Sequence, residues 1–295
     1  MAHLLRKKAF LSSLVFFSLL FLITCSSQQP NFSKSNLEKI LNAFHDPNSS
    51  TVLVAAHRAA HEQFPENSIP AIKRAIEIGA DIVEMDARAT KDGVIILMHD
   101  SAVDRTTNGK GKVKNLTFEQ IQQLDLKAND SDKTFKVPTL KQALLTIKNN
   151  IMVDIDIKAA PIKKLVSLVH ETGTGQQVIF FTRNFSKLDS VLALDSTLMV
   201  MPRAKSAQEV PDILARYRPP VLHIDDSFFT PEVVGQIKKS GARVWINALG
   251  RADIKAMMGL KEKAYMPLIE GGGNILQTDR PNTLLSFLRE KQLHW

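Results

Sequence analysis

The chain has 295 residues, 44% of them hydrophobic, which is enough to bury one large core or two small ones. Its single cysteine, Cys25, excludes an intramolecular disulfide, so an exported form must depend on its core for stability. The net charge of +8 is modest and scattered. A nucleic-acid partner is not expected, because such partners require a concentrated basic stripe.

The N-terminus reads as a bacterial export signal. A basic segment, RKK, precedes the apolar run AFLSSLVFFSLLFLIT, which is shorter than the ~20 residues that span a bilayer. The run ends in LITC, which resembles a lipobox, although Thr24 stands where a small residue is usual. We expect residues 1–24 to be a signal peptide and Cys25 to be lipidated. Residues 25–50 would then form a tether with a short helix. The alternative is an uncleaved signal anchor.

From residue 51 the chain alternates apolar runs with helical segments. The apolar runs predict buried strands at 52–57, 81–86, 151–157, 177–182, 197–201, 221–225, 242–248 and 274–279. Helices are predicted at 67–78, 139–149, 161–171, 184–194, 206–216, 230–240, 250–258 and 280–290, the last capped by Asp279. This alternation predicts an α/β fold, a (β/α)₈ TIM-type barrel over residues 51–295. A doubly wound open sheet is the alternative, but the first strand lacks its glycine-rich turn.

One interval interrupts the alternation, between the second strand and its helix. We expect residues 87–138 to form a small insertion above the barrel mouth. TKDG is a hairpin turn signal, so VIILMH is predicted to fold back antiparallel to DIVEMD. This hairpin would bring His99 towards Glu84 and Asp86.

Polar residues gather at the carboxyl ends of the first three barrel strands, where the active sites of such barrels lie. They are His57, Arg58, Glu84, Asp86, Asp154, Asp156 and Lys158. Carboxylates crowded in this way become protonated unless a cation is present, and oxygen donors without cysteine suit Mg²⁺ or Ca²⁺. Arg58 and Lys158 are expected to bind an anionic substrate, with arginine suited to a phosphate. An ion-pair network that closes the barrel mouth is the alternative.

Six segments stand in a specific order between about residues 52 and 290: AHRAAHEQFPENS, GADIVEMDARATKDGVIILMHD, VDRTTNGKG, VDIDIK, VWINALG and QTDRP. In this order and spacing they resemble the glycerophosphodiester phosphodiesterase family. The resemblance implies a TIM-type barrel with a small insertion, one divalent cation and two catalytic histidines, matched here by His57 and His99. Glu84 and Asp86 match metal ligands of the family. Asp156 matches a third ligand that is usually a glutamate.

The chain departs from the family pattern at one backbone position and keeps a supporting motif. HRA replaces the usual HRG, so Ala59 is expected to be tolerated only if the backbone there needs no positive φ. Glu66 and Asn67 match the PEN motif, whose polar residues support the site or the substrate.

Three further residues have less certain places. Trp245 is expected either to pack against the substrate or to fill the top of the barrel. His61 lies in an unmatched loop and is expected at the surface or in support of the site. His223 ends an apolar run and is expected to line the barrel interior.

These residues predict metal-dependent hydrolysis of glycerophosphodiesters to glycerol 3-phosphate and an alcohol, with two histidines as acid and base. One alternative is a phospholipase D-like cleavage of lysophospholipid or sphingolipid head groups. Another is a non-catalytic glycerophosphodiester-binding lipoprotein. The expected partners are a small substrate and, through the lipid anchor, a membrane. We expect an exported lipoprotein, periplasmic or associated with the outer membrane. No oligomeric state is predicted.

Overall fold

The structure, a computed structural model, describes residues 34–128 and 133–295. The predicted signal peptide and Cys25 lie outside these ranges. Within them, no helix combines the length and the apolar character needed to cross a membrane.

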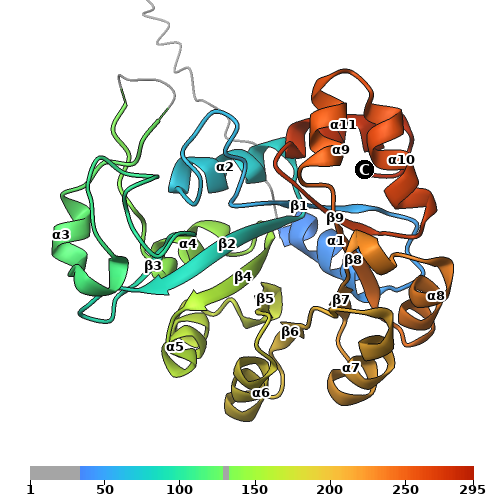
Figure 1. Ribbon diagram of the computed structural model, residues 1–295, viewed down its shortest axis with the longest axis horizontal. Coiled ribbons are helices and arrows are strands. Elements are labelled where there is room, and N and C mark those ends of the chain that lie inside the picture. Colours follow the sequence, from blue (N-terminus) through green and yellow to red (C-terminus); the bar gives the residue numbers. More distant parts are fainter. Residues whose placement is uncertain (1–33, 129–132) are drawn as a thin grey trace, which may run out of the picture. The chain divides into compact units, whose positions relative to one another are not determined.

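Eight parallel strands form a barrel in the order β6-β5-β4-β2-β1-β9-β8-β7 (Figure 1). Their bounds are β1 Leu53–Ala56, β2 Ile82–Ala89, β4 Met152–Ala159, β5 Val178–Phe181, β6 Met199–Met201, β7 Val221–His223, β8 Arg243–Asn247 and β9 Ile275–Thr278. A parallel bridge between Arg203 and His223 joins the two ends of this order. The backbone N–H of His223 also donates to the carbonyl of Pro202 at 3.1 Å. The predicted (β/α)₈ barrel is therefore confirmed, and an open sheet is excluded.

Helices cover the outside of the barrel. They are α2 Ile69–Ile78, α4 Leu140–Ile147, α5 Ile162–Thr172, α6 Phe185–Leu194, α7 Val210–Tyr217, α8 Pro231–Lys239, α9 Arg251–Met257, α10 Lys261–Glu270 and α11 Pro281–Glu290. Local signals mark several ends: α2 stops at Gly79, whose φ of 80° suits glycine. The helix predicted at 250–258 is present as α9, whereas α10 was not predicted. Gly259, with φ 81°, separates two helices, and Pro267 inside the second weakened its sequence signal.

Helix α1 (Lys34–His45) packs against the amino-terminal end of the barrel. Its Ile40 and Phe44 are fully buried and join the side chains that fill the barrel interior. Arg243, the first residue of β8, is fully buried beside them and donates to the carbonyls of Ala43 at 2.6 Å and Thr51 at 2.7 Å. Burial lowers the pKa of Arg243 to about 10, which leaves it charged at neutral pH. Because α1 covers this end, the functional cavity must open at the other.

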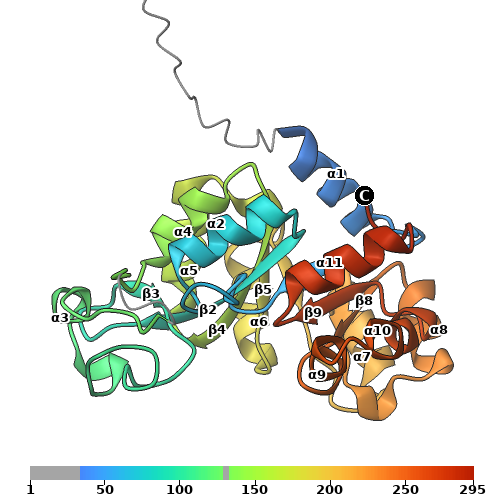
Figure 2. The ribbon, with the colours of Figure 1, turned by 90° about the horizontal axis from the view of Figure 1, so that it is seen from above.

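The segment between β2 and α4 forms a small unit beside the barrel, on the left in Figure 2. It contains β3 (Ile95–Leu97), which pairs antiparallel with β2, and the short helix α3 (Phe118–Gln122). A separate apolar cluster holds it together, made of Ile96, Met98, Val103, Val113, Ile121, Leu126 and Val137. The predicted hairpin is present, and the backbone N–H of Met98 donates to the carbonyl of Asp86 at 2.9 Å. This pairing carries His99 to the barrel mouth.

Candidate active site

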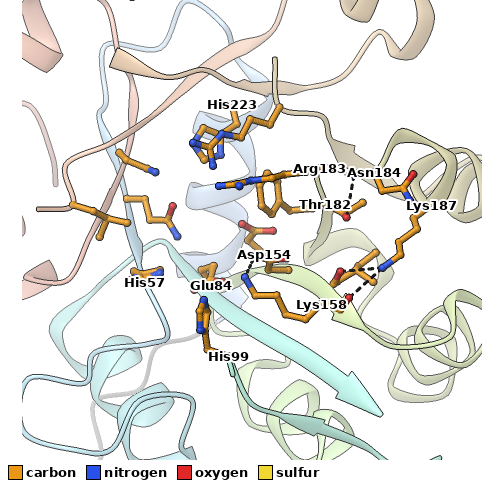
Figure 3. Close-up of a pocket in the computed structure, with 17 residues that line it drawn as sticks. His57, Glu84, His99, Asp154, Lys158, Thr182, Arg183, Asn184, Lys187 and His223 are labelled. Atoms are coloured by element: carbon orange, nitrogen blue, oxygen red, sulfur yellow. Dashed lines mark hydrogen bonds and ion pairs between the residues drawn. The ribbon is translucent and has the colours of Figure 1, made fainter. Parts of the chain in front are cut away.

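A pocket opens at the carboxyl ends of the barrel strands (Figure 3). Both predicted catalytic histidines line it, together with acids from β2 and β4. In the view of Figure 3, His57, Glu84 and His99 lie on one side, and Arg183, Thr182 and Lys187 lie opposite. The charged and polar residues of the lining are His57, Glu84, His99, Asp154, Asp156, Lys158, Thr182, Arg183, Asn184, Lys187, Arg203, His223, Asn247 and Gln277.

Three carboxylates converge beside the pocket. Oxygen atoms of Glu84, Asp86 and Asp156 lie within 4.8 Å of one another. The strand register explains this, because Asp86 of β2 lies opposite Asp156 of β4. Burial raises the pKa of Glu84 well above its ordinary range, and the nearby charges of Asp86 and Asp154 raise it further. Such crowding is relieved by a cation, and three carboxylates suit a hard one.

The turn after β1 presents a backbone donor to this cluster. The N–H of Arg58 donates to Glu84 Oε2 at 2.7 Å. Arg58 and Ala59 both have positive φ, 50° and 68°. The expectation that Ala59 would avoid positive φ is therefore wrong. The turn is held despite the strain because the N–H of Ala59 lies 3.2 Å from the carbonyls of both Ala56 and Glu84.

Asp86 contacts one neutral side chain, Asn67, and two cationic ones, Lys158 and Arg58, whose Nε lies 3.8 Å from Asp86 Oδ2. The amide of Asn67 donates to Asp86 Oδ2 at 2.7 Å, and its oxygen accepts the backbone N–H of Asp86 at 3.1 Å. Lys158 Nζ lies 3.1 Å from Asp86 Oδ1 and 2.5 Å from Asp156 Oδ2. Burial lowers the pKa of Lys158, but the two carboxylates outweigh it and leave the pKa above its ordinary value. Lys158 is therefore charged.

A chain of ion pairs runs from the turn after β1 to the second histidine. Glu66 accepts from Arg58 Nη1 at 3.1 Å and from Arg105 Nη1 at 2.7 Å. Arg105 Nε donates to Asp100 at 2.7 Å, and Asp100 Oδ1 lies 2.7 Å from His99 Nδ1. The hydrogen bonds from Arg105 and His99 hold the pKa of Asp100 well below its usual range. An ionised Asp100 thus fixes the ring of His99.

His57 is also paired with a carboxylate, that of Asp279, which directly follows β9. Asp279 Oδ1 lies 2.7 Å from His57 Nδ1 and 3.1 Å from His61 Nε2. Burial opposes ionisation of Asp279, but both histidines outweigh it and hold the pKa well below its ordinary range. Asp279 does not cap α11 as expected, since the cap position is Arg280. His57, His61 and Asp279 form a second group with metal-ligand spacing. We favour the carboxylate cluster, because these histidine nitrogens are already bound to Asp279.

Residues 57–245 match the model of the glycerophosphoryl diester phosphodiesterase family. The chain belongs to this family. As a member it is a phosphoric diester hydrolase.

One relative supports the family assignment, and two solved structures share the fold. The chain is 32% identical over 248 residues to a glycerophosphodiester phosphodiesterase of Caldanaerobacter subterraneus, which covers 81% of this chain and 98% of that protein. A glycerophosphoryl diester phosphodiesterase structure from Parabacteroides distasonis has a TM-score of 0.76 at 23% identity, covering 88% of this chain and 93% of that one. A phosphodiesterase from Oleispira antarctica, solved with the product sn-glycerol-3-phosphate, has a TM-score of 0.67 at 22% identity and covers 80% and 96%.

The far wall of this phosphodiesterase pocket contains Arg183 and Arg203, which sequence reasoning did not assign, and its floor contains His223, which was expected in the barrel interior. His223 is 3% exposed, and neither ring nitrogen has a hydrogen-bond partner among the described residues. Burial, with the charges of Arg203 and Arg183, holds the pKa of His223 well below its ordinary value, so this ring is neutral. Arg203 pairs with Asp225, whereas Arg183 is exposed and points into the pocket (Figure 3).

Trp245 lies below the pocket and does not line it. Its side chain is fully buried among the residues that fill the barrel interior. Its indole N–H donates to Gln277 Oε1 at 3.4 Å, and Gln277 lines the pocket above. Trp245 therefore supports the pocket floor from beneath.

Proposed function

We propose that this protein hydrolyses glycerophosphodiesters to glycerol 3-phosphate and an alcohol, using a divalent cation and two histidines. The observation that carries this proposal is the pairing of each histidine with its own carboxylate. Nδ1 of His57 lies 2.7 Å from Asp279, and Nδ1 of His99 lies 2.7 Å from Asp100. Both rings line one pocket with Glu84, so the two Nε2 atoms are left to act on a single substrate.

The residues that would hold the cation are Glu84, Asp86 and Asp156. The donor set fits Mg²⁺ or Ca²⁺, because it is entirely oxygen and because burial and the charge of Asp86 raise the pKa of both Glu84 and Asp156. Asp156 is one methylene shorter than the family's usual glutamate, yet its oxygen still falls within the 4.8 Å cluster. A bound cation would neutralise a phosphate oxygen and acidify the attacking hydroxyl.

Lys158 is the lysine that we assign to the phosphate. It lines the pocket, it is charged, and it sits beside the carboxylate cluster at 2.5 Å from Asp156. Arg58 was also expected to bind phosphate. Its Nη1 bonds to Glu66 at 3.1 Å and its backbone N–H bonds to Glu84, so we assign it chiefly to holding Glu84 in place. A direct contact of Arg58 with the phosphate stays a prediction.

The two histidines would divide the proton transfers. One accepts the proton of the attacking hydroxyl, which is either water or the substrate's own glycerol 2-hydroxyl through a cyclic phosphate. The other donates a proton to the oxygen of the departing alcohol. Each transfer is typically worth about 10²–10⁴-fold in rate. Asp279 and Asp100 would keep Nδ1 protonated in both rings and so direct each Nε2 towards the reacting atoms.

The test is phosphorus NMR of the products from glycerophosphocholine and from lysophosphatidylcholine, with Mg²⁺ or Ca²⁺. We expect glycerol 3-phosphate from the first substrate and its near-complete loss in His57→Ala and His99→Ala. His170→Ala is the control, because His170 is 52% exposed on α5 and pairs with Asp195 in the same manner. Cleavage of lysophosphatidylcholine alone would favour the phospholipase D-like alternative. Ligand binding without turnover would favour the non-catalytic one.

We also propose that the mature protein is anchored to a bacterial membrane through a lipid on Cys25. The apolar run followed by LITC supports this. Cys25→Ala should prevent lipidation, which the mass of the mature N-terminal peptide measures. An unmodified Cys25 in the wild-type protein would rule the anchor out.

A further inference from the structure

Exposed apolar side chains are concentrated at one place on the described surface. Of the six large hydrophobic residues that are exposed in the described ranges, four fall between positions 254 and 260. We name them the α9 patch: Ile254 (58% exposed), Met257 (62%), Met258 (71%) and Leu260 (42%). Contiguous apolar surface of this kind marks a site of interaction rather than a feature of the fold.

The fold does not require this patch. Asp253, on the inward face of α9, attaches the helix to the barrel and is only 4% exposed. Its carboxylate accepts hydrogen bonds from Thr278 Oγ1 at 2.5 Å and from the backbone N–H of Asp279 at 2.8 Å. Ala256, on the same face, is also 4% exposed. The helix is held by these contacts, and the outer methionines contribute nothing to them.

The charges around the α9 patch are positive. Arg251, Lys255 and Lys263 are exposed around it. Of the acids in the same stretch, Asp253 is buried, and Glu262 pairs with Lys291 at 2.7 Å. Apolar side chains framed by lysine and arginine are typical of surfaces that insert into the interface of an anionic bilayer. A second copy of the chain is a poorer partner, because two α9 patches in contact would bring the same positive charges together.

We propose that the α9 patch docks on an anionic membrane surface, with its methionines among the acyl chains and its lysines at the lipid phosphates. This contact is separate from the anchor proposed at Cys25, and it does not depend on which diester the enzyme cleaves.

The α9 patch belongs to a helix that begins just after two pocket-lining residues. Asn247 and Leu249 line the pocket, and α9 begins two residues later at Arg251. Figure 1 shows α9 beside α10, directly following β8. Asp253 of α9 also holds the backbone of Asp279, the partner of His57. Docking through this helix would therefore place the catalytic histidine and the pocket mouth next to the lipid surface.

Tryptophan fluorescence of the full chain tests the proposal. Met258→Trp places a reporter in the α9 patch, and Leu145→Trp places one at a similarly exposed site (53%) on α4. Vesicles of phosphatidylglycerol with brominated acyl chains should quench the additional emission of M258W about twofold or more and leave that of L145W unchanged. The native tryptophans, Trp245 and Trp295, contribute the same background to both variants.

Charge reversal separates docking of α9 from the effect of any other membrane anchor. Adding Lys255→Glu and Arg251→Glu to M258W should abolish most of the quenching. Vesicles of brominated phosphatidylcholine alone should quench M258W less than the brominated anionic vesicles do. Equal quenching of M258W and L145W would overturn the proposal. So would quenching that survives charge reversal, or an emission shift of M258W that occurs without vesicles and depends on protein concentration.

Discussion

His57 and Asp279 lie 222 positions apart in the chain, yet Asp279 Oδ1 is 2.7 Å from His57 Nδ1. Their meeting depends on the pairing of β1 with β9, in which Ala56 lies opposite Thr278. Asp279 is itself fixed by Asp253 of α9, which accepts its backbone N–H at 2.8 Å. The orientation of His57, the first of the two proposed catalytic histidines, is thus determined by the residue that follows the last strand of the barrel.

Replacing Asp279 should slow the reaction without unfolding the protein. Asp279→Asn replaces the carboxylate by a neutral amide, which cannot stabilise a protonated His57. We therefore expect kcat to fall about 10²–10⁴-fold. Steady-state kinetics measure the loss, and circular dichroism checks the fold. Asp195→Asn is the matched control, because Asp195 pairs with surface His170 at 2.8 Å. Unchanged kcat in Asp279→Asn would show that this carboxylate does not orient His57.

The same carboxylate should make stability depend on pH. Its folded-state pKa lies below the unfolded value, so ionised Asp279 stabilises the fold above about pH 4. This contribution is lost as the pH falls through the folded-state pKa. Urea unfolding of the wild type and of Asp279→Asn should therefore differ above about pH 4, and the difference should shrink as the pH falls further. A difference that persists unchanged at pH 2 would contradict the assignment.

Addition of Mg²⁺ or Ca²⁺ should stabilise the protein through the carboxylate cluster. At a concentration 100 times the Kd, a ligand that binds only the folded state adds about 2.7 kcal/mol. Calorimetry should show a rise in Tm with the cation, and Glu84→Gln and Asp156→Asn should greatly reduce it. Asp212→Asn, an exposed acid on α7, is the control. A rise of equal size in Glu84→Gln would place the cation elsewhere.

Local patterns were sufficient to predict half of the site. The spacing of Glu84 and Asp86 places both on one face of a strand, and the TKDG turn returns His99 to them. Sequence could not show that Asp279 pairs with His57. An aspartate before a helix can either cap that helix or pair with a distant histidine, and only the closed barrel distinguishes the two. The places of Arg183 and His223 depend on the same closure, through β5 to β7.

Ala59 shows a limit of another kind. Alanine in place of the family's glycine was expected to be tolerated only without positive φ, but Ala59 has a φ of 68° and its N–H bonds to the carbonyls of Ala56 and Glu84. Helix α10 was missed for a different reason, because Pro267 inside it weakens the helical signal of the sequence.

Substitutions at Ala59 should follow the strain of its backbone. Left-handed backbone costs an L-residue about 1–2 kcal/mol, which Ala59→Gly removes. The variant also loses a buried methyl worth about 0.8 kcal/mol and gains unfolded-state entropy of about 0.4–1 kcal/mol. Its unfolding free energy should thus stay within about 1 kcal/mol of the wild type. Ala59→Val, β-branched and fully buried, should lose more than about 2 kcal/mol. Equal unfolding free energies of the two variants would show that the backbone at Ala59 is not strained.

Arg183 should select among substrates by the charge of their alcohol. Its guanidinium enters the pocket opposite His57 and Glu84 (Figure 3). We expect the departing alcohol of a bound diester on this side of the pocket. Glycerophosphoserine and glycerophosphoethanolamine differ by one carboxylate, so the ratio of their kcat/KM values isolates that contact. We expect the wild type to prefer glycerophosphoserine about tenfold and Arg183→Ala to lose most of this preference.

The ratio distinguishes a contact with the carboxylate from a general loss of activity. Arg183→Lys should retain part of the preference, because it keeps the charge and loses only the planar fork. Arg183→Glu should reverse it, since a carboxylate facing a carboxylate repels. Arg216→Ala, at an exposed ion pair with Asp189, should leave both substrates unaffected. If Arg183→Ala lowers both kcat/KM values equally, Arg183 contributes to binding the phosphate instead, and the alcohol is recognised by the neutral floor around His223.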